Sequence, residues 1–105
     1  MTTFDDRESA FEAKFAHDEE MRFKAVARRN RIAGLWAAGL LGKTGAEADA
    51  YAAAVVSADF EEASDADVRR KLARDLGSKA DDATIERRLQ AAMAEAQSQL
   101  LGEAG

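Results

Sequence analysis

The first forty residues carry two apolar stripes that one helix could not bury in the same small core. The first stripe consists of phenylalanines that fall within about 40° of one another at helical spacing, Phe4, Phe11 and Phe15. It stops where it would next meet Asp18 and Arg22. The second stripe lies on another face and consists of Met21, Ala25, Ile32 and Trp36. The sequence therefore predicts that the first stripe is made for a different protein, although a bent core face on the first helix is an alternative interpretation.

The amino-acid composition favours a mostly helical protein of one domain. The 105 residues suffice for a modest core, and they include no cysteine and no proline. Without cysteine, a disulfide framework and a thiolate metal site are both excluded. The longest apolar run, residues 32–41, is about half as long as a membrane span and contains two glycines. Because the chain opens with acidic residues rather than a targeting signal, we expect a cytoplasmic protein.

Charge is distributed unevenly along the chain, whose net charge is −5. Residues 1–20 contain seven acidic and two basic residues, and residues 21–31 contain no acidic residue. The second segment holds five cations, here named the basic collar: Arg22, Lys24, Arg28, Arg29 and Arg31. The collar could be a solvated helix face. We favour a protein-docking patch, because the apolar stripe lies directly beside it.

Glycines and capping residues divide the chain into four expected helices. Gly42 and Gly77 are helix stops, and Thr44 with Glu47 forms a capping-box signature. The later helices are expected to start near Thr44, near Ser64, and at Asp81 or Asp82. We therefore predict an all-α four-helix bundle in residues 19–105, preceded by a flexible or helical arm in residues 1–18. The final residues 102–105 are expected to fray.

The predicted core is built from the larger apolar residues of all four helices. It comprises Met21, Val26, Ile32, Leu35, Trp36, Leu40, Leu41, Tyr51, Val55, Phe60, Val68, Leu72, Leu76, Ile85, Leu89 and Met93. This set fills a small bundle and leaves no evident place for the phenylalanine stripe. Gly34 and Gly39 lower helix propensity, which suggests that another helix crosses closely at both positions.

The chain shows no catalytic signature, and we expect neither enzyme activity nor a cofactor. A single histidine excludes a histidine-based metal cluster. Residues 39–44 end like a phosphate-binding loop, but the required earlier glycine is missing. The acidic run after His17 is unsuited to metal, because adjacent carboxylates diverge around a helix. His17 itself is either a solvated side chain or a pH-sensitive contact.

Several segments resemble the zeta subunit family, small alphaproteobacterial inhibitors of the rotary F-type ATP synthase. The similar segments are residues 4–8, 10–20, 22–25, 27–30 and 34–38. The resemblance implies a four-helix bundle and an N-terminal inhibitory segment, from about Thr2 to His17. In this family, that segment enters the catalytic head and blocks rotation in the direction of ATP hydrolysis.

The resemblance also implies the partner, the catalytic head of the F-type ATP synthase, and the basic collar is our candidate for the surface that docks the folded body there. The candidate partner-binding residues are Phe4, Arg7, Phe11, Glu12, Lys14, Phe15, His17, Arg22, Arg28 and Arg29. We expect a monomer when free, without membrane insertion or nucleic acid, and a location at the cytoplasmic face of the inner membrane when bound. Two other function classes stay open: a nucleic-acid-associated protein that uses the collar, and a nucleotide sensor with a pocket near Trp36 and Tyr51.

Overall fold

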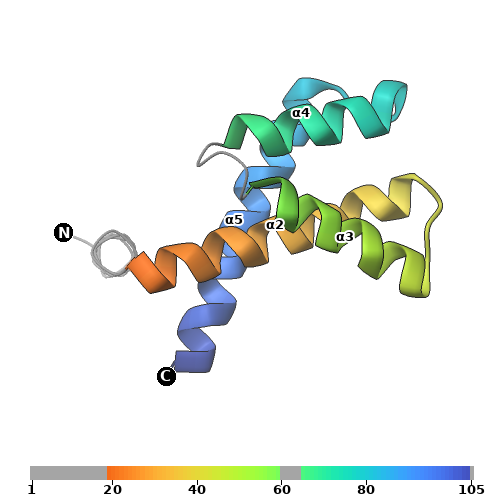
Figure 1. The fold of residues 1–105 in the computed structure, drawn as a ribbon. Coiled ribbons are helices and arrows are strands. Elements are labelled where there is room, and N and C mark those ends of the chain that lie inside the picture. Colours follow the sequence, from red (N-terminus) through yellow and green to blue (C-terminus); the bar gives the residue numbers. More distant parts are fainter. Residues whose placement is uncertain (1–18, 60–64, 105) are drawn as a thin grey trace.

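The computed structural model describes residues 19–59 and 65–104, which form an all-α bundle without strands. Four α-helices and one short 3₁₀ helix follow in the order α2 (Glu19–Leu40), α3 (Gly45–Asp59), α4 (Asp65–Leu76), η1 (Gly77–Lys79) and α5 (Asp82–Ala104). Figure 1 shows α3 running back along α2, while α5 crosses α2 obliquely. The predicted fold class is confirmed. The phenylalanine stripe and Phe60 lie outside the described residues.

The helices α2 and α3 form a tight antiparallel hairpin whose turn is set by Gly42. Gly42 has a φ of 77°, and the backbone N–H of Lys43 donates to the carbonyl of Ala38 at 2.9 Å. The N–H of Gly42 donates to the carbonyl of Gly39 at 3.2 Å, which completes a Schellman motif. The predicted stop at Gly42 is thereby confirmed.

Gly34 allows α2 and α3 to approach closely, as the sequence suggested. A Cβ at position 34 would lie 2.8 Å from the Cα of Ala52 and 3.3 Å from the Cβ of Val55. The same expectation for Gly39 is wrong, because nothing lies within 4 Å of a Cβ built there. Gly39 is exposed near the end of α2 and lies about 140° around the helix from Gly34.

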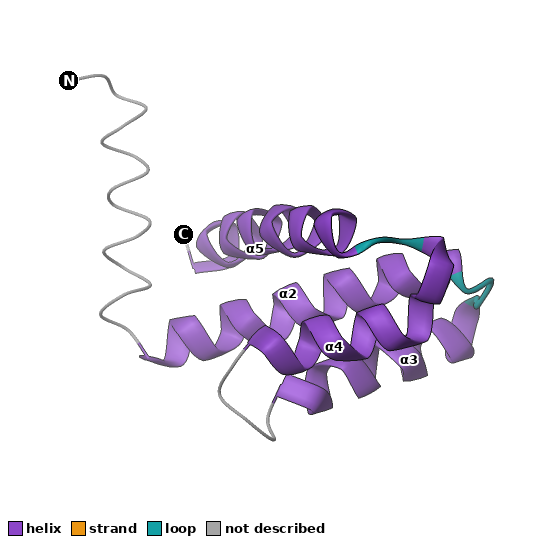
Figure 2. Ribbon diagram, turned by 90° about the horizontal axis from the view of Figure 1, so that it is seen from above, coloured by secondary structure: helices purple, strands orange, loops and turns teal. Residues whose placement is uncertain are grey.

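The fourth predicted helix, α5, begins at a side-chain cap and runs further than expected. The N–H of Thr84 donates to the Oδ1 of Asp81 at 2.8 Å, which identifies Asp81 as the cap. The prediction that residues 102–104 fray is wrong, because α5 continues to Ala104. The last turn is held by Glu103, which binds Arg28 of α2, and by the buried side chain of Leu100. Figure 2 shows this end of α5 lying on the side where α2 begins.

The core divides into two apolar clusters of different size. The larger cluster joins all four helices and contains Ala33, Ala37, Val55, Val68, Leu72, Leu76, Ile85, Leu89 and Ala92. The smaller one joins the start of α2 to the end of α5 through Ala25 and Leu100, with Met21, Met93 and Leu101 packed against it. Alanines contribute much of both clusters, because they allow the helices to approach one another closely.

Two predicted core residues are wrong, and two polar residues that were not predicted are buried. Leu35 and Leu40 are 37% and 40% exposed, because they lie on the outer face of α2. Arg29 and Asn30 are buried on its inner faces. Of the other predicted core residues in the described part of the chain, six are fully buried and the rest are partly buried.

Candidate docking surface at the start of α2

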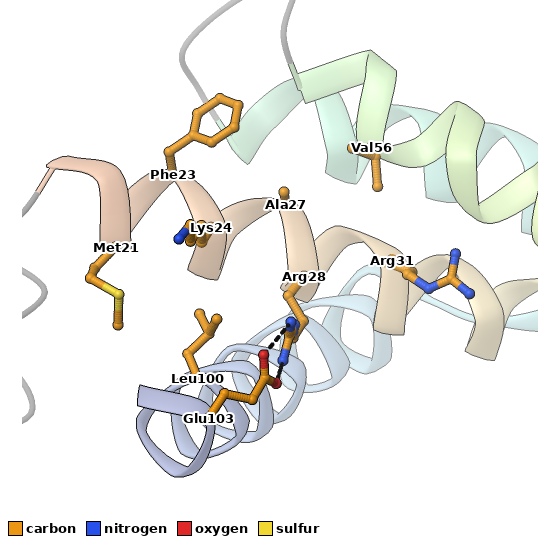
Figure 3. Close-up of a pocket in the computed structure, with 9 residues that line it drawn as sticks. All are labelled: Met21, Phe23, Lys24, Ala27, Arg28, Arg31, Val56, Leu100 and Glu103. Carbon is orange, nitrogen blue, oxygen red and sulfur yellow. Dashed lines mark hydrogen bonds and ion pairs between the residues drawn. The ribbon is translucent and has the colours of Figure 1, made fainter. Parts of the chain in front are cut away.

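A shallow groove runs over the first half of α2, at the end of the bundle from which residues 1–18 extend. It has a volume of about 640 Å³ and is lined by Met21, Phe23, Lys24, Ala27, Arg28, Arg31, Val56, Leu100 and Glu103. Figure 3 shows that most of these side chains come from α2, with Val56 on α3 at one edge and Leu100 and Glu103 on α5 at the other. The groove therefore combines apolar surface with cations of the collar.

Phe23 is the most exposed large apolar residue among the described residues, at 57% of its full accessible area. Figure 3 shows its ring projecting away from α5. Single exposed apolar residues are common on protein surfaces, but Phe23 is continuous with Met21, Ala27 and Val56 in one groove. An exposed aromatic ring in a mixed apolar and charged patch is typical of a protein-docking surface.

The collar does not form a single exposed patch, because one of its arginines faces the core. Arg29 retains 3% of its accessible area, and its Nε donates to the Oδ1 of Asn30 at 2.9 Å. It lies four residues from both Ala25 and Ala33, which are also buried, and so shares their inward row on α2. This spacing is visible in the sequence and could have separated Arg29 from the exposed cations.

The other collar cations reach the surface, and three of them have acidic partners there. Arg28 binds both carboxylate oxygens of Glu103, with Nη2 donating to Oε1 at 3.0 Å. Lys24 lies 3.2 Å from Glu20, and Arg31 lies 3.7 Å from Asp49. The hydrogen bond from Arg28 lowers the pKa of Glu103. Exposed pairs of this kind are weak, so a partner can replace them at little cost.

The seven candidate residues before Asp18, from Phe4 to His17, lie outside the described residues. Of the remaining three, Arg28 lines the groove, Arg22 is exposed on the opposite face of α2, and Arg29 is buried. In the described ranges 19–59 and 65–104, no group of three metal-ligating side chains gathers at one point. No helix in those ranges is long and apolar enough to cross a membrane.

A second polar cluster, which sequence reasoning missed, links α3 to α4. The hydroxyl of Tyr51 donates to the Oδ2 of Asp75 at 2.8 Å, and Lys71 Nζ donates to the same oxygen at 2.9 Å. Burial and the bond to Asp75 raise the pKa of Tyr51. Burial raises the pKa of Asp75, but its hydrogen bonds outweigh burial and lower it overall. Tyr51 and Asp75 are 24 residues apart, so no local pattern could reveal the pair.

Comparison with known families covers the α2 and α3 residues of the groove and also the N-terminal segment. The family model for the ATPase inhibitor subunit zeta matches residues 1–99. The chain belongs to the ATPase inhibitor subunit zeta family. The match includes the phenylalanine stripe as well as the bundle, so the resemblance noted in the sequence is confirmed. A search of curated proteins found no match.

A solved structure supports the fold. It was determined by NMR in solution and is 53% identical to this zeta-family chain, with a TM-score of 0.73. The match covers 79% of this chain and 98% of the other. Family membership supports a role as an inhibitor of the ATP synthase and implies an interaction with that enzyme. The family's description is that of an inhibitor subunit and not of an enzyme.

Proposed function

We propose that residues 1–18 form an inhibitory arm that inserts into the catalytic head of the F-type ATP synthase. The observation that carries this proposal is the family match, which starts at residue 1 and so includes the acidic segment with Phe4, Phe11 and Phe15. The bundle supports the proposal, because its described helices form two apolar clusters among themselves. The arm occupies residues 1–18, and the bundle occupies residues 19–105.

The mechanism of inhibition is steric. Catalysis by a rotary ATPase requires its subunits to open and close in turn, and an arm wedged between them stops that cycle. Phe4, Phe11 and Phe15 are the apolar anchors of the arm. The polar contacts come from the charged or titratable side chains between them, Arg7, Glu12, Lys14 and His17.

The bundle acts as a second docking point that makes a weak arm effective. Burying three phenylalanines contributes about 1.5–3 kcal/mol each. Ordering a flexible segment costs on the order of 1 kcal/mol for each residue, so ordering all 18 residues costs more than the three phenylalanines contribute. A body held on the outside of the head raises the effective concentration of the arm. The collar cations that line the groove, Lys24, Arg28 and Arg31, suit an acidic surface at that place.

Inhibition of ATP hydrolysis by the purified synthase tests the proposal. The full chain should inhibit, a chain lacking residues 1–17 should not, and Phe11→Ala or Phe15→Ala should inhibit more weakly. Leu40→Ala is a matched control, because it also removes an apolar side chain but from an exposed site at the far end of α2. Equal inhibition by the full chain and by both phenylalanine variants would exclude the arm as the inhibitory element.

A further inference from the structure

The groove over α2 has properties that match those of the arm attached beside it. Its apolar lining includes Phe23, Met21 and Leu100, and its charged lining is three cations against the single acid Glu103. The arm carries the phenylalanine stripe, and residues 1–18 hold five acidic against two basic residues. The two surfaces are therefore complementary in charge, and both are partly apolar.

The chain is long enough for the arm to reach the groove. Residue 18 directly precedes α2, and the lining of the groove begins at Met21. From Met21 to Arg31 the groove extends about 15 Å at a helical rise of 1.5 Å per residue. A helical arm would span about 17 Å from Phe4 to Phe15. A reversal of a few residues before Glu19 would lay the phenylalanine stripe along the groove.

We infer that the groove is the resting seat of the chain's own arm, residues 1–18, in the free protein. A second copy of the bundle fits less well, because it would bring two cationic grooves together. Tethering favours the arm, since a short linker gives an effective concentration in the millimolar range. A contact of only millimolar affinity is then populated in about half of the molecules. Such a contact holds the arm without preventing its release to a tighter partner.

This seat would regulate inhibition, and that consequence rests on the proposed function. While the arm occupies the groove, neither the phenylalanine stripe nor the cations Lys24, Arg28 and Arg31 are available to the synthase. Release of the arm exposes both at once, so insertion of the arm and docking of the body become coupled. Phe23 belongs to the resting contact and therefore opposes inhibition.

Paramagnetic relaxation tests the resting contact in the free, full-length protein. Because the chain has no cysteine, Ser9→Cys gives one site in the arm for a nitroxide label. Backbone amides of Ala27 and Gly102 should broaden several-fold more than those of Gly77–Lys79, which lie at the other end of the bundle. The same label in a Phe11→Ala/Phe15→Ala chain gives the baseline for an arm that is merely tethered. Equal broadening in the two chains would overturn the inference.

Two further measurements separate this inference from its alternatives. Labelled chains mixed with unlabelled, isotope-enriched chains should give no broadening of the groove, and broadening there would assign the groove to a second copy instead. In the hydrolysis assay, Phe23→Ala should raise the association rate about two-fold, because it frees the docked half of the arms. A chain that shows the resting contact but never inhibits would refute the proposed function and leave the seat intact. A chain that inhibits but shows no resting contact would refute this inference and leave the proposed function intact.

Discussion

The close approach of α2 and α3 at Gly34 predicts opposite effects for the same substitution at two sites of one helix. In Gly34→Ala, the new methyl group would meet the Cα of Ala52 at 2.8 Å, where ordinary contact begins at 3.4 Å. The obstructing atom belongs to the backbone, so α3 as a whole must move. In Gly39→Ala, nothing lies within 4 Å of the new group. Gly39 is also helical without a positive φ, so alanine fits there without strain.

The expected magnitudes follow from two competing effects. Alanine favours a helix over glycine by about 0.5–1 kcal/mol, and this gain applies at both positions. Overpacking of a closely packed site costs about 1–3 kcal/mol, and this cost applies only at position 34. We therefore expect Gly34→Ala to lower the free energy of unfolding by about 1 kcal/mol and Gly39→Ala to raise it by about 0.5 kcal/mol.

Urea denaturation followed by circular dichroism measures both changes directly. In a thermal melt, 1 kcal/mol corresponds to about 4–8 °C for a domain of this size, so the two variants should differ by well over 5 °C. The Ala52→Gly/Gly34→Ala double variant should not recover, since the Cα of Ala52 remains in place. If Gly34→Ala proves as stable as Gly39→Ala, the helices do not approach as described and the reasoning fails.

Three further predictions concern the core, the collar and the α3–α4 link. Leu72→Ala should lower the free energy of unfolding by about 2–5 kcal/mol, because Leu72 is fully buried. Deletion of residues 1–17 should lower it by less than about 2 kcal/mol. Urea denaturation measures both changes. Arg28→Glu should slow association with the synthase at low salt and leave the fold intact. Arg29→Glu should unfold the protein, because it places a carboxylate at a buried position. Stopped-flow association rates and thermal melts distinguish the two variants. Because the pKa of Tyr51 is raised on folding, the stability it contributes is complete below pH 10 and is lost as the pH rises above that value. Tyr51→Phe should remove this loss of stability above pH 10. Identical dependences of the free energy of unfolding on pH for Tyr51→Phe and the unsubstituted protein would contradict the prediction.

The sequence predicted the fold well where local patterns determine it. Gly42 and Asp81 mark helix boundaries through their own backbone and side-chain chemistry, and both act as expected. Leu35 and Leu40 were assigned to the core because every residue from 32 to 40 is apolar, so hydrophobicity alone cannot say which side of this part of α2 faces inward. The end of α5 was missed for a related reason. Its last turn is held by a contact with Arg28, which is 75 residues away in sequence.

The candidate site was predictable in composition but not in arrangement. The sequence identified the collar as a group, and three of its five cations, Lys24, Arg28 and Arg31, do line one groove. It did not separate Arg29 from the exposed cations, although Arg29 lies four residues after Ala25 of the second apolar stripe. Neither Phe23 nor Leu100 was proposed as part of the surface, because the groove exists only where α2 and α5 meet.

The division of the core into two clusters has a mechanical consequence if the synthase holds residues 1–18 as proposed. A pull on residue 18 enters the bundle at Glu19, at the end secured by Ala25, Leu100 and the pair of Arg28 with Glu103. This end is joined by fewer apolar side chains than the four-helix cluster behind it. Under load, α2 should therefore peel from α5 first, while the larger cluster stays closed. The first turns of α2 can therefore open reversibly under load and pack again when the load ends, without unfolding of the rest of the bundle.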